Sequence, residues 1–352
     1  MRTKTRKAAC SWVALTVALG MAGGCVLDLY GEDPVDQAFY FPISMAASQD
    51  GSHVYVLSSN YDQRFNTGWV SVLDVDAALA LEDGVTSTTV PLVPRADGGQ
   101  VSVLNLGGMI ALDPSGQHLL VSHRGQNHLD QTRLSWLDIG SGGASIDCGD
   151  SDFTGDMTAQ EGKTDCDEEH FVRIEVDGGD DSLADYEADG SFGERTFENA
   201  FSLTSFEFVT ADGTVKPMMA VGFVNSEYIR LYEIIAGKPV ISATLKTSVN
   251  GAGHMVYRRV GESQFLLVGG RSISTQAVAA IDLTQSLVED EAVSYGEGLE
   301  GLVTASVLGM DASPDGSRIY LGSGHPQPNV DGVPDVLAVL DGSRVVTNEH
   351  SS

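Results

Sequence analysis

The sequence predicts an all-β protein built as a β-propeller of four-stranded blades. A unit with the same order of elements recurs five times, with a turn glycine between its first two strands and an acidic residue closing its third. The spacing from turn glycine to closing acid is nearly constant in the pairs Gly51–Asp74, Gly116–Asp138, Gly213–Glu233, Gly261–Asp282 and Gly316–Asp341. Short strands, turn glycines and a regular period are typical of propellers. Five units predict a ring of five to seven blades.

The first unit shows the pattern most fully. Asp50-Gly51 marks a turn, because glycine tolerates the positive φ that tight turns require. The segment His53–Leu57 alternates as a strand, and Trp69–Leu73 forms the next one after a polar loop. We expect the first strand at Ile43–Ala47 and the outer strand near Val85–Leu92.

The other four units repeat this order with three predicted strands each. In chain order these strands are Met109–Leu112, His118–Ser122 and Leu134–Asp138; Phe206–Val209, Met218–Phe223 and Tyr228–Glu233; Met255–Tyr257, Phe265–Gly269 and Val278–Asp282; and Leu308–Ala312, Arg318–Gly322 and Val336–Asp341. Helix is expected only as single turns at Ala77–Glu82 and Leu283–Glu291, since neither segment is long enough for a stable isolated helix.

The first residues form a targeting segment. Four basic residues precede an apolar stretch, Ala8 to Met21, that is too short to span a bilayer, and small residues follow it up to Cys25. The segment resembles a bacterial lipoprotein signal, which implies a lipidated Cys25 and a protein exported to the outer membrane or cell envelope. A plain secretory signal and a retained anchor helix are the alternatives. We predict a signal at 1–24, an acidic tether at 25–38, the propeller at 39–345 and a disordered tail at 346–352.

Charge restricts the partners. The chain of 352 residues carries 49 acidic and 20 basic side chains, a formal net charge of −29. Such a surface repels nucleic acid and anionic head groups. We therefore expect no nucleic-acid partner and membrane contact through the N-terminal lipid only. The sequence does not indicate an oligomeric state.

The largest break in the repeat is an acidic insertion at about 139–197. It contains Cys148 and Cys166, the pair that remains once Cys10 leaves with the signal and Cys25 takes the lipid. In an exported protein such a pair predicts a disulfide.

Within this insertion, residues 150–161 match a twelve-residue calcium loop. Calcium requires six to eight oxygen ligands, and the glycine at the sixth position permits the sharp turn. The predicted ligands are Asp150, Asp152, Thr154, the backbone carbonyl of Asp156, Thr158 through water, and Glu161. A solvated acidic loop without a metal is the alternative.

The motif at Tyr55–Asn60, preceded by Asp-Gly and followed by Val-x-Val-x-Asp, resembles the YVTN β-propeller repeat and, through it, the lactonase-like propellers. The runs at 59–68 and 122–127 and the cysteine-bounded insertion resemble uncharacterised myxobacterial-type surface lipoproteins. This resemblance covers roughly residues 39–341. It implies the fold and the location, and it leaves the activity open.

Candidate ligand residues lie near the predicted central funnel. Arg64, Arg124 and Arg271 belong to the same loop of units one, two and four, and His254 precedes an innermost strand. These side chains could bind an anionic group. In the alternative, each arginine pairs with the closing acid of its own or a neighbouring blade, and the histidines bond locally.

No nucleophile elbow, phosphate-binding loop, haem motif or dinucleotide fingerprint is present in the sequence. We therefore expect a binding or scaffold module rather than an enzyme, with an envelope protein or a small anion as ligand. The alternative is a lactonase-like hydrolase that uses the funnel.

Overall fold

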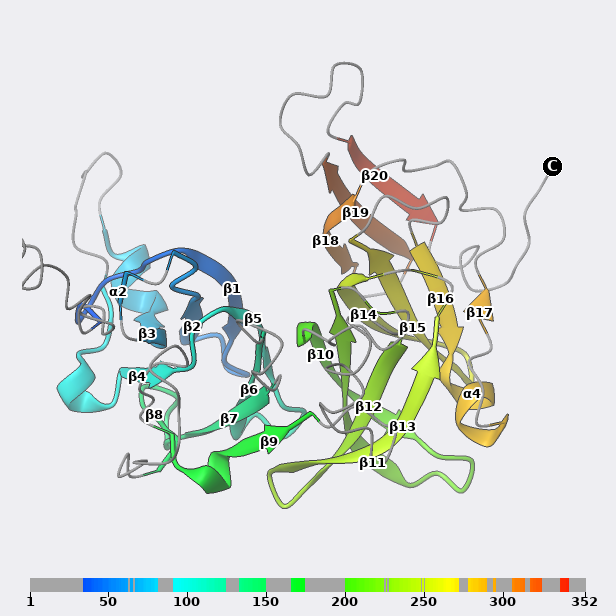
Figure 1. Ribbon diagram of the computed structural model, residues 1–352, viewed down its shortest axis with the longest axis horizontal. Coiled ribbons are helices and arrows are strands. Elements are labelled where there is room, and N and C mark those ends of the chain that lie inside the picture. The colour runs from blue at the N-terminus through cyan, green and yellow to red at the C-terminus, as the bar shows by residue number, and fades with distance from the viewer. Residues whose placement is uncertain are drawn as a thin grey trace, which may run out of the picture.

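The computed structural model describes residues 34–62, 64–65, 67–81, 91–124, 133–149, 166–174, 200–224, 226, 228–247, 249, 251–271, 278–289, 294–295, 306–313, 317–324 and 336–341. Their strands form five antiparallel sheets arranged side by side as in a β-propeller (Figure 1). The all-β propeller class is confirmed. The predicted range of five to seven blades stays a prediction.

Each sheet is a meander whose strands pair in chain order. The first sheet contains β1 (Pro42–Ala47), β2 (His53–Ser58), β3 (Gly68–Asp74) and β4 (Gln100–Val103). The second contains β5 (Gly107–Leu112), β6 (His118–His123), β7 (Arg133–Ile139) and β8 (Ile146–Asp147), with β9 (Phe171–Arg173) also paired to β7.

The remaining sheets follow the same plan. The third contains β10 (Ala200–Val209), β11 (Val215–Phe223), β12 (Tyr228–Ile235) and β13 (Lys238–Lys246). The fourth contains β14 (Ala252–Val260), β15 (Ser263–Gly270), β16 (Val278–Asp282) and β17 (Ser294–Tyr295). The described part of the fifth contains β18 (Ser306–Ala312), β19 (Arg318–Gly324) and β20 (Val336–Asp341).

One predicted strand was wrong. The outer strand of the first sheet is β4 and not the segment near Val85–Leu92, of which residues 82–90 lie outside the described residues. Leu92 forms an isolated bridge with Leu73, supported by hydrogen bonds from Asp74 N–H to the Pro91 carbonyl and from Val93 N–H to the Val72 carbonyl, and this pairing does not extend into a strand of the described residues. Pro91 and Pro94 flank it, and proline has no N–H to donate to a ladder. The chain then turns through a short 3₁₀ helix, η1 (Arg95–Asp97), before β4 begins.

The core lies between neighbouring sheets, where side chains from facing strands interdigitate. Separate apolar clusters join the first and second sheets, the second and third, the third and fourth, and the fourth and fifth. Burying one large apolar side chain contributes about 1.5–3 kcal/mol, so these layers dominate the stability. The innermost strands pack in the order β1, β5, β10, β14, β18 (Figure 1).

Every innermost strand has one register shift near its beginning. The shifts fall between Pro42 and Ser44, Gly107 and Ile110, Ala200 and Ser202, Ala252 and His254, and Val307 and Gly309. A bulge bends its strand and re-aims the extra residue. The repeated bulge therefore sets which side chains point away from the ladder at one end of the molecule.

The predicted disulfide is confirmed, because Cys148 and Cys166 are bonded and buried in the cluster between the first two sheets. The expected short helices are also present, as α2 (Val75–Leu79) and α4 (Leu283–Glu289). Each begins directly after a closing acid, and the Asp74 and Asp282 carboxylates accept backbone N–H bonds of the first turn. Among the described residues, no helix is long and apolar enough to cross a membrane.

Candidate functional site

Two of the predicted ligand arginines meet at one aromatic ring. The guanidinium carbon of Arg271 lies 4.2 Å from the centre of the Phe201 ring, and that of Arg124 lies 5.5 Å from the same centre. Arg124 also lies 5.5 Å from the centre of the Tyr61 ring. Arg124 follows β6, Arg271 follows β15, Tyr61 follows β2 and Phe201 is in the bulge of β10, so four sheets contribute.

Equivalent backbone hydrogen bonds place the two arginines. The N–H of Arg124 donates to the carbonyl of Leu106 at 3.2 Å, and the N–H of Arg271 donates to that of Gly251 at 2.6 Å. In the first sheet the corresponding bond comes from Ser59 and not from Arg64. Arg64 therefore belongs to the same loop as the other two arginines but not to the same position.

Phe201 is held by close contacts between β5 and β10. The Ser122 hydroxyl donates to the carbonyl of Phe201 at 2.8 Å. A Cβ added at Gly108 would lie 2.6 Å from that carbonyl oxygen and 2.8 Å from the Phe201 Cα. Only glycine fits this approach, because real Cβ contacts are longer. The backbone that carries Phe201 is therefore fixed before any ligand arrives.

The two guanidinium groups repel each other in a partly buried environment. Burial lowers the pKa of Arg124, and the charge of Arg271 lowers it further. Burial also lowers the pKa of Arg271. Both groups stay cationic, because the arginine side chain is not deprotonated in proteins. An anion between them would remove an unfavourable interaction.

The closing acids do not neutralise Arg124. Its side-chain contacts are the rings of Tyr61 and Phe201, and within the described residues no carboxylate forms an ion pair with it. Four of the five closing acids face other partners: Asp74 and Asp282 cap helices, Asp138 faces two histidines, and Glu233 binds Lys216.

Strand geometry explains why this pairing fails. An arginine that follows the second strand lies where the third strand begins, whereas the closing acid lies near the third strand's far end. The seven residues of β7 separate these ends by roughly 20 Å. The alternative in which Arg124 pairs with the closing acid of its own blade, Asp138, is therefore wrong.

Arg64 packs on a different aromatic cluster. Its guanidinium carbon lies 5.4 Å from the centre of the Phe65 ring and 6.0 Å from that of Tyr40. The Tyr40 hydroxyl donates to the Asp62 carboxylate at 2.7 Å, and this hydrogen bond raises the Tyr40 pKa. Arg64 thus packs beside a tyrosine and a carboxylate at the edge of the first sheet.

The histidines occupy separate places. His254 is on β14, on the same face as Val256 and Arg258, and Arg258 donates to the carbonyl of Ser313 in the fifth sheet. His254 therefore belongs to the side of the fourth sheet that faces the fifth. His123 is buried, with Nε2 2.8 Å from the Ser135 hydroxyl. His325 lies outside the described residues.

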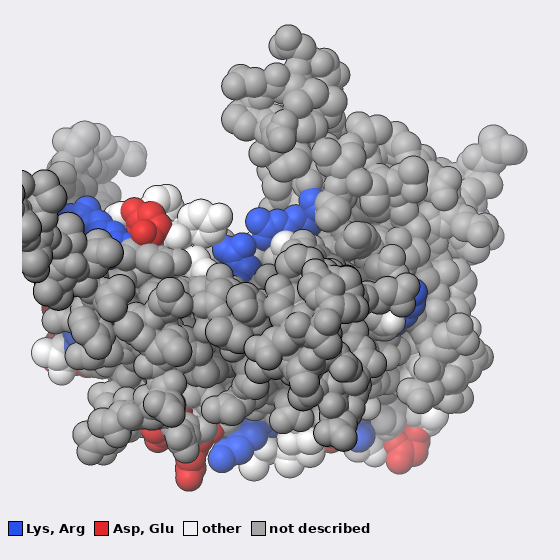
Figure 2. Space-filling model, viewed as in Figure 1, with Lys and Arg blue, Asp and Glu red and all other residues white. Residues whose placement is uncertain are grey.

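Figure 2 shows several Lys and Arg side chains along a hollow at the upper side of the molecule, together with one acidic patch and uncharged side chains. In a chain of net charge −29, such a local excess of positive charge is the opposite of the overall surface. Sequence reasoning missed Tyr61 and Phe201, because an aromatic residue in a loop or at a strand end resembles any other partly buried side chain. The one signal that would have identified Phe201 is its position in the bulge that recurs near the beginning of every innermost strand.

The other predicted sites remain predictions. The calcium ligands Asp150, Asp152, Thr154, Asp156 and Glu161 lie outside the described residues, and so does the lipidation residue Cys25.

No family model matches the chain, and no curated protein matches its sequence. Solved structures that resemble the chain include hydrazine synthase of Kuenenia stuttgartiensis, at 12% identity and a TM-score of 0.45. The alignment covers 90% of this chain, which spans only 66% of that one.

Two candidate 6-phosphogluconolactonases from Bacteroides are also similar. The Bacteroides uniformis protein has 13% identity and a TM-score of 0.44, and the alignment covers 86% of this chain and 73% of that protein. The Bacteroides fragilis protein has 11% identity and a TM-score of 0.43, and the alignment covers 85% of this chain and 84% of that protein. Likenesses this distant do not bear on function.

Proposed function

We propose that this protein is a lipid-anchored binding module of the bacterial cell envelope that takes a small anion between Arg124 and Arg271. The observation that carries the proposal is a partly buried arginine that meets no carboxylate among the described residues and lies beside a second arginine and against two aromatic rings. A carboxylate or phosphate oxygen would accept hydrogen bonds from Arg124 and relieve the repulsion between the two guanidinium groups.

The aromatic rings favour the same arrangement. Phe201 packs against both guanidinium groups, which limits their rotamers and lowers the entropy cost of binding. Tyr61 is 60% exposed, so it offers an accessible surface beside the charged pair. The cluster then combines two positive charges with aromatic rings, a combination of polar and aromatic groups that small-ligand sites commonly have.

Titration calorimetry with phosphate, sulfate and di- and tricarboxylates tests the proposal. A hydrogen bond to a charged group contributes about 1.5–3 kcal/mol, so Arg124→Gln should weaken binding roughly ten- to hundredfold. The matched control is Arg259→Gln, since Arg259 is exposed and its Nε donates only to the nearby Gly261 carbonyl. Equal affinity in wild type and Arg124→Gln would refute the site.

The hydrolase hypothesis is tested with the same variants. A lactonase-like enzyme requires a base within hydrogen-bond reach of its substrate. Turnover of a lactone by the wild-type protein, lost in Arg124→Gln and in His254→Gln, would favour an enzyme over a binding module. Anion binding without turnover would favour the module.

Calcium at residues 150–161 is a separate part of the proposal. Millimolar calcium should protect this segment from proteolysis, and Glu161→Gln should abolish the protection, because the last ligand binds through both carboxylate oxygens. If calorimetry at millimolar calcium shows no binding heat, the calcium hypothesis is wrong and the segment is a solvated acidic loop.

A further inference from the structure

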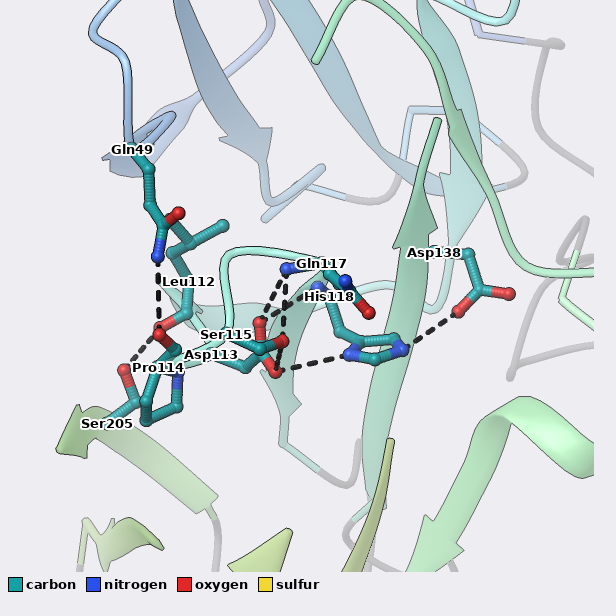
Figure 3. A network of polar contacts seen from close by, with 9 residues as sticks. All are labelled: Gln49, Leu112, Asp113, Pro114, Ser115, Gln117, His118, Asp138 and Ser205. Carbon is teal, nitrogen blue, oxygen red and sulfur yellow. Dashed lines mark hydrogen bonds and ion pairs between the residues drawn. The ribbon is translucent and has the colours of Figure 1, made fainter. Parts of the chain in front are cut away.

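A second cluster of chemically active side chains lies at the opposite end of the second sheet. His118 begins β6, Asp138 is its cross-strand partner on β7, and His170 ends the short helix η2 (Glu168–His170) just before β9. Figure 3 shows His118 between Asp113 and Asp138. Strands β6 and β7 and the helix η2 thus bring two imidazoles to one carboxylate.

Each imidazole is oriented by a second carboxylate. Nδ1 of His118 lies 3.2 Å from Oδ2 of Asp113, and Nδ1 of His170 lies 2.6 Å from Oδ1 of Asp167. The Asp113 carboxylate also accepts hydrogen bonds from the Ser115 hydroxyl and from the Gln117 and His118 N–H groups. The Asp167 carboxylate likewise accepts from the N–H groups of Glu169 and His170.

These ionised carboxylates determine which ring nitrogen is available. An ionised carboxylate only accepts, so a neutral imidazole beside it carries its proton on Nδ1 and its lone pair on Nε2. Histidines that bind metals usually have this arrangement, in which a carboxylate fixes the tautomer and the ring orientation.

Both Nε2 atoms approach Asp138 at distances that do not suit a hydrogen bond. Nε2 of His118 lies 3.4 Å from Oδ1 of Asp138, and Nε2 of His170 lies 3.7 Å from Oδ2. Hydrogen bonds of this type span roughly 2.7–3.2 Å. Two ligands of one tetrahedral ion, each at about 2.0–2.2 Å from it, lie roughly 3.3–3.6 Å apart.

A glycine of the third sheet packs closely against the His118 ring. Gly237, in the turn between β12 and β13, has φ +82, and a Cβ there would lie 2.8 Å from Nε2 of His118. The next residue, Lys238, faces Glu169 at 3.8 Å and the Trp136 ring. The charge of Lys238 is thus partly offset by Glu169.

We propose that His118, His170 and Asp138 bind a divalent transition-metal ion of the zinc type, with Asp113 and Asp167 as positioning residues. Two imidazoles and one carboxylate suit such an ion, and water would complete its coordination. As the side chains stand, no group of three or more His, Cys, Asp or Glu residues in the described part of the chain could hold a metal ion. The ion must therefore draw the ligands together, and Asp138, whose side chain is 59% exposed, is the one that moves.

Cobalt binding to the purified full chain tests the proposal, with the disulfide intact and bound metals first removed by chelation. Wild type should bind one cobalt ion with the visible absorption of tetrahedral coordination, and zinc should displace it. Asp138→Asn and His170→Gln should each weaken binding at least tenfold, and Asp167→Asn should weaken it ten- to hundredfold. The matched control is His53→Gln, on β2 of the first sheet, which should bind as wild type does.

Three results would overturn the site. The first is an absence of cobalt absorption and zinc binding heat in wild type. The second is equal affinity in wild type, Asp138→Asn and His170→Gln, each shown to be folded by circular dichroism. The third is displacement of cobalt by equimolar calcium, because a site with two nitrogen ligands should prefer zinc strongly to calcium.

Discussion

At the scale of single residues, the turns between first and second strands show how side chains specify the backbone. The turn after β10 contains Asp212, whose carboxylate accepts hydrogen bonds from the Thr210 hydroxyl and from the Thr214 N–H. Asp50 and Asp113 serve the same role in the first two sheets. The aspartate of each Asp-Gly or Asp-Pro turn is therefore part of the fold, since it occupies backbone donors that the ladder leaves open.

At this scale we predict that the turn lowers the pKa of Asp212. The Thr210 hydrogen bond is the largest cause that lowers it, to about 2. Since the folded value is below the ordinary value of 3.8, the turn stabilises the protein above about pH 4, and this contribution is lost as the pH falls toward 2. NMR titration should show Asp212 ionised at pH 3, and Thr210→Val should raise its pKa. A value unchanged in the variant would contradict the assignment.

At the scale of elements, sheets are joined by side chains that replace missing backbone partners. Gln264 on β15 accepts from the N–H of Val209 at 2.7 Å and donates to the Val209 carbonyl at 2.7 Å. One buried amide thus completes the ladder at the end of β10 across the boundary between the third and fourth sheets. Apolar packing between sheets has no such direction, so this contact helps to fix their register.

Gln264→Leu should therefore destabilise the protein by about 2–4 kcal/mol, because it leaves a buried donor and a buried acceptor without partners. Urea unfolding would measure the loss. The matched control is Gln49→Leu, which removes a 3.2 Å bond from an exposed glutamine to the Pro114 carbonyl and should cost less than about 0.5 kcal/mol. Equal losses in the two variants would contradict this account.

The disulfide is the second element-scale prediction. Cys148 and Cys166 are 18 residues apart and fully buried between the first two sheets. Replacing both with alanine should lower the free energy of unfolding by about 3 kcal/mol, since the unfolded chain gains loop entropy. Urea unfolding with and without reductant would test this: reductant should destabilise wild type and leave the double variant unchanged.

At the scale of the whole molecule, charge and anchoring act together. The acidic surface repels anionic head groups, so the proposed membrane association would depend on lipid rather than on the folded domain. The described residues that precede β1 pack on the first sheet, where Trp69 donates to the Ala38 carbonyl and Arg95 to Asp36. An anchor upstream would therefore hold the first sheet close to the bilayer.

Lipidation of Cys25 predicts a protein that partitions into detergent and has the added mass of acyl chains. Cys25→Ala should lose both properties and keep the melting temperature of the domain. Intact-mass measurement on the exported wild-type protein decides the question. A wild-type mass without acyl chains would exclude the anchor.

The sequence by itself determined the elements and their order. Alternating residues, turn aspartates and glycines, and closing acids predicted the inner strands of every sheet, because these signals act between near neighbours in the chain. The outer strand of the first sheet was predicted wrongly. Pro91 and Pro94 cannot donate N–H groups to the ladder, and the strand forms after them, as β4. The pairing of Cys148 with Cys166 was also predicted, since the predicted signal and lipidation left one pair of cysteines.

Only the tertiary structure decided which side chains meet. Arg124 and Arg271 are far apart in the chain, and no local pattern relates either one to Phe201. Their meeting depends on the packing of neighbouring sheets and on a bulge that re-aims one residue of β10. His118, Asp138 and His170 were brought together in the same way, because strand register, and not spacing along the sequence, decides which side chains share a face.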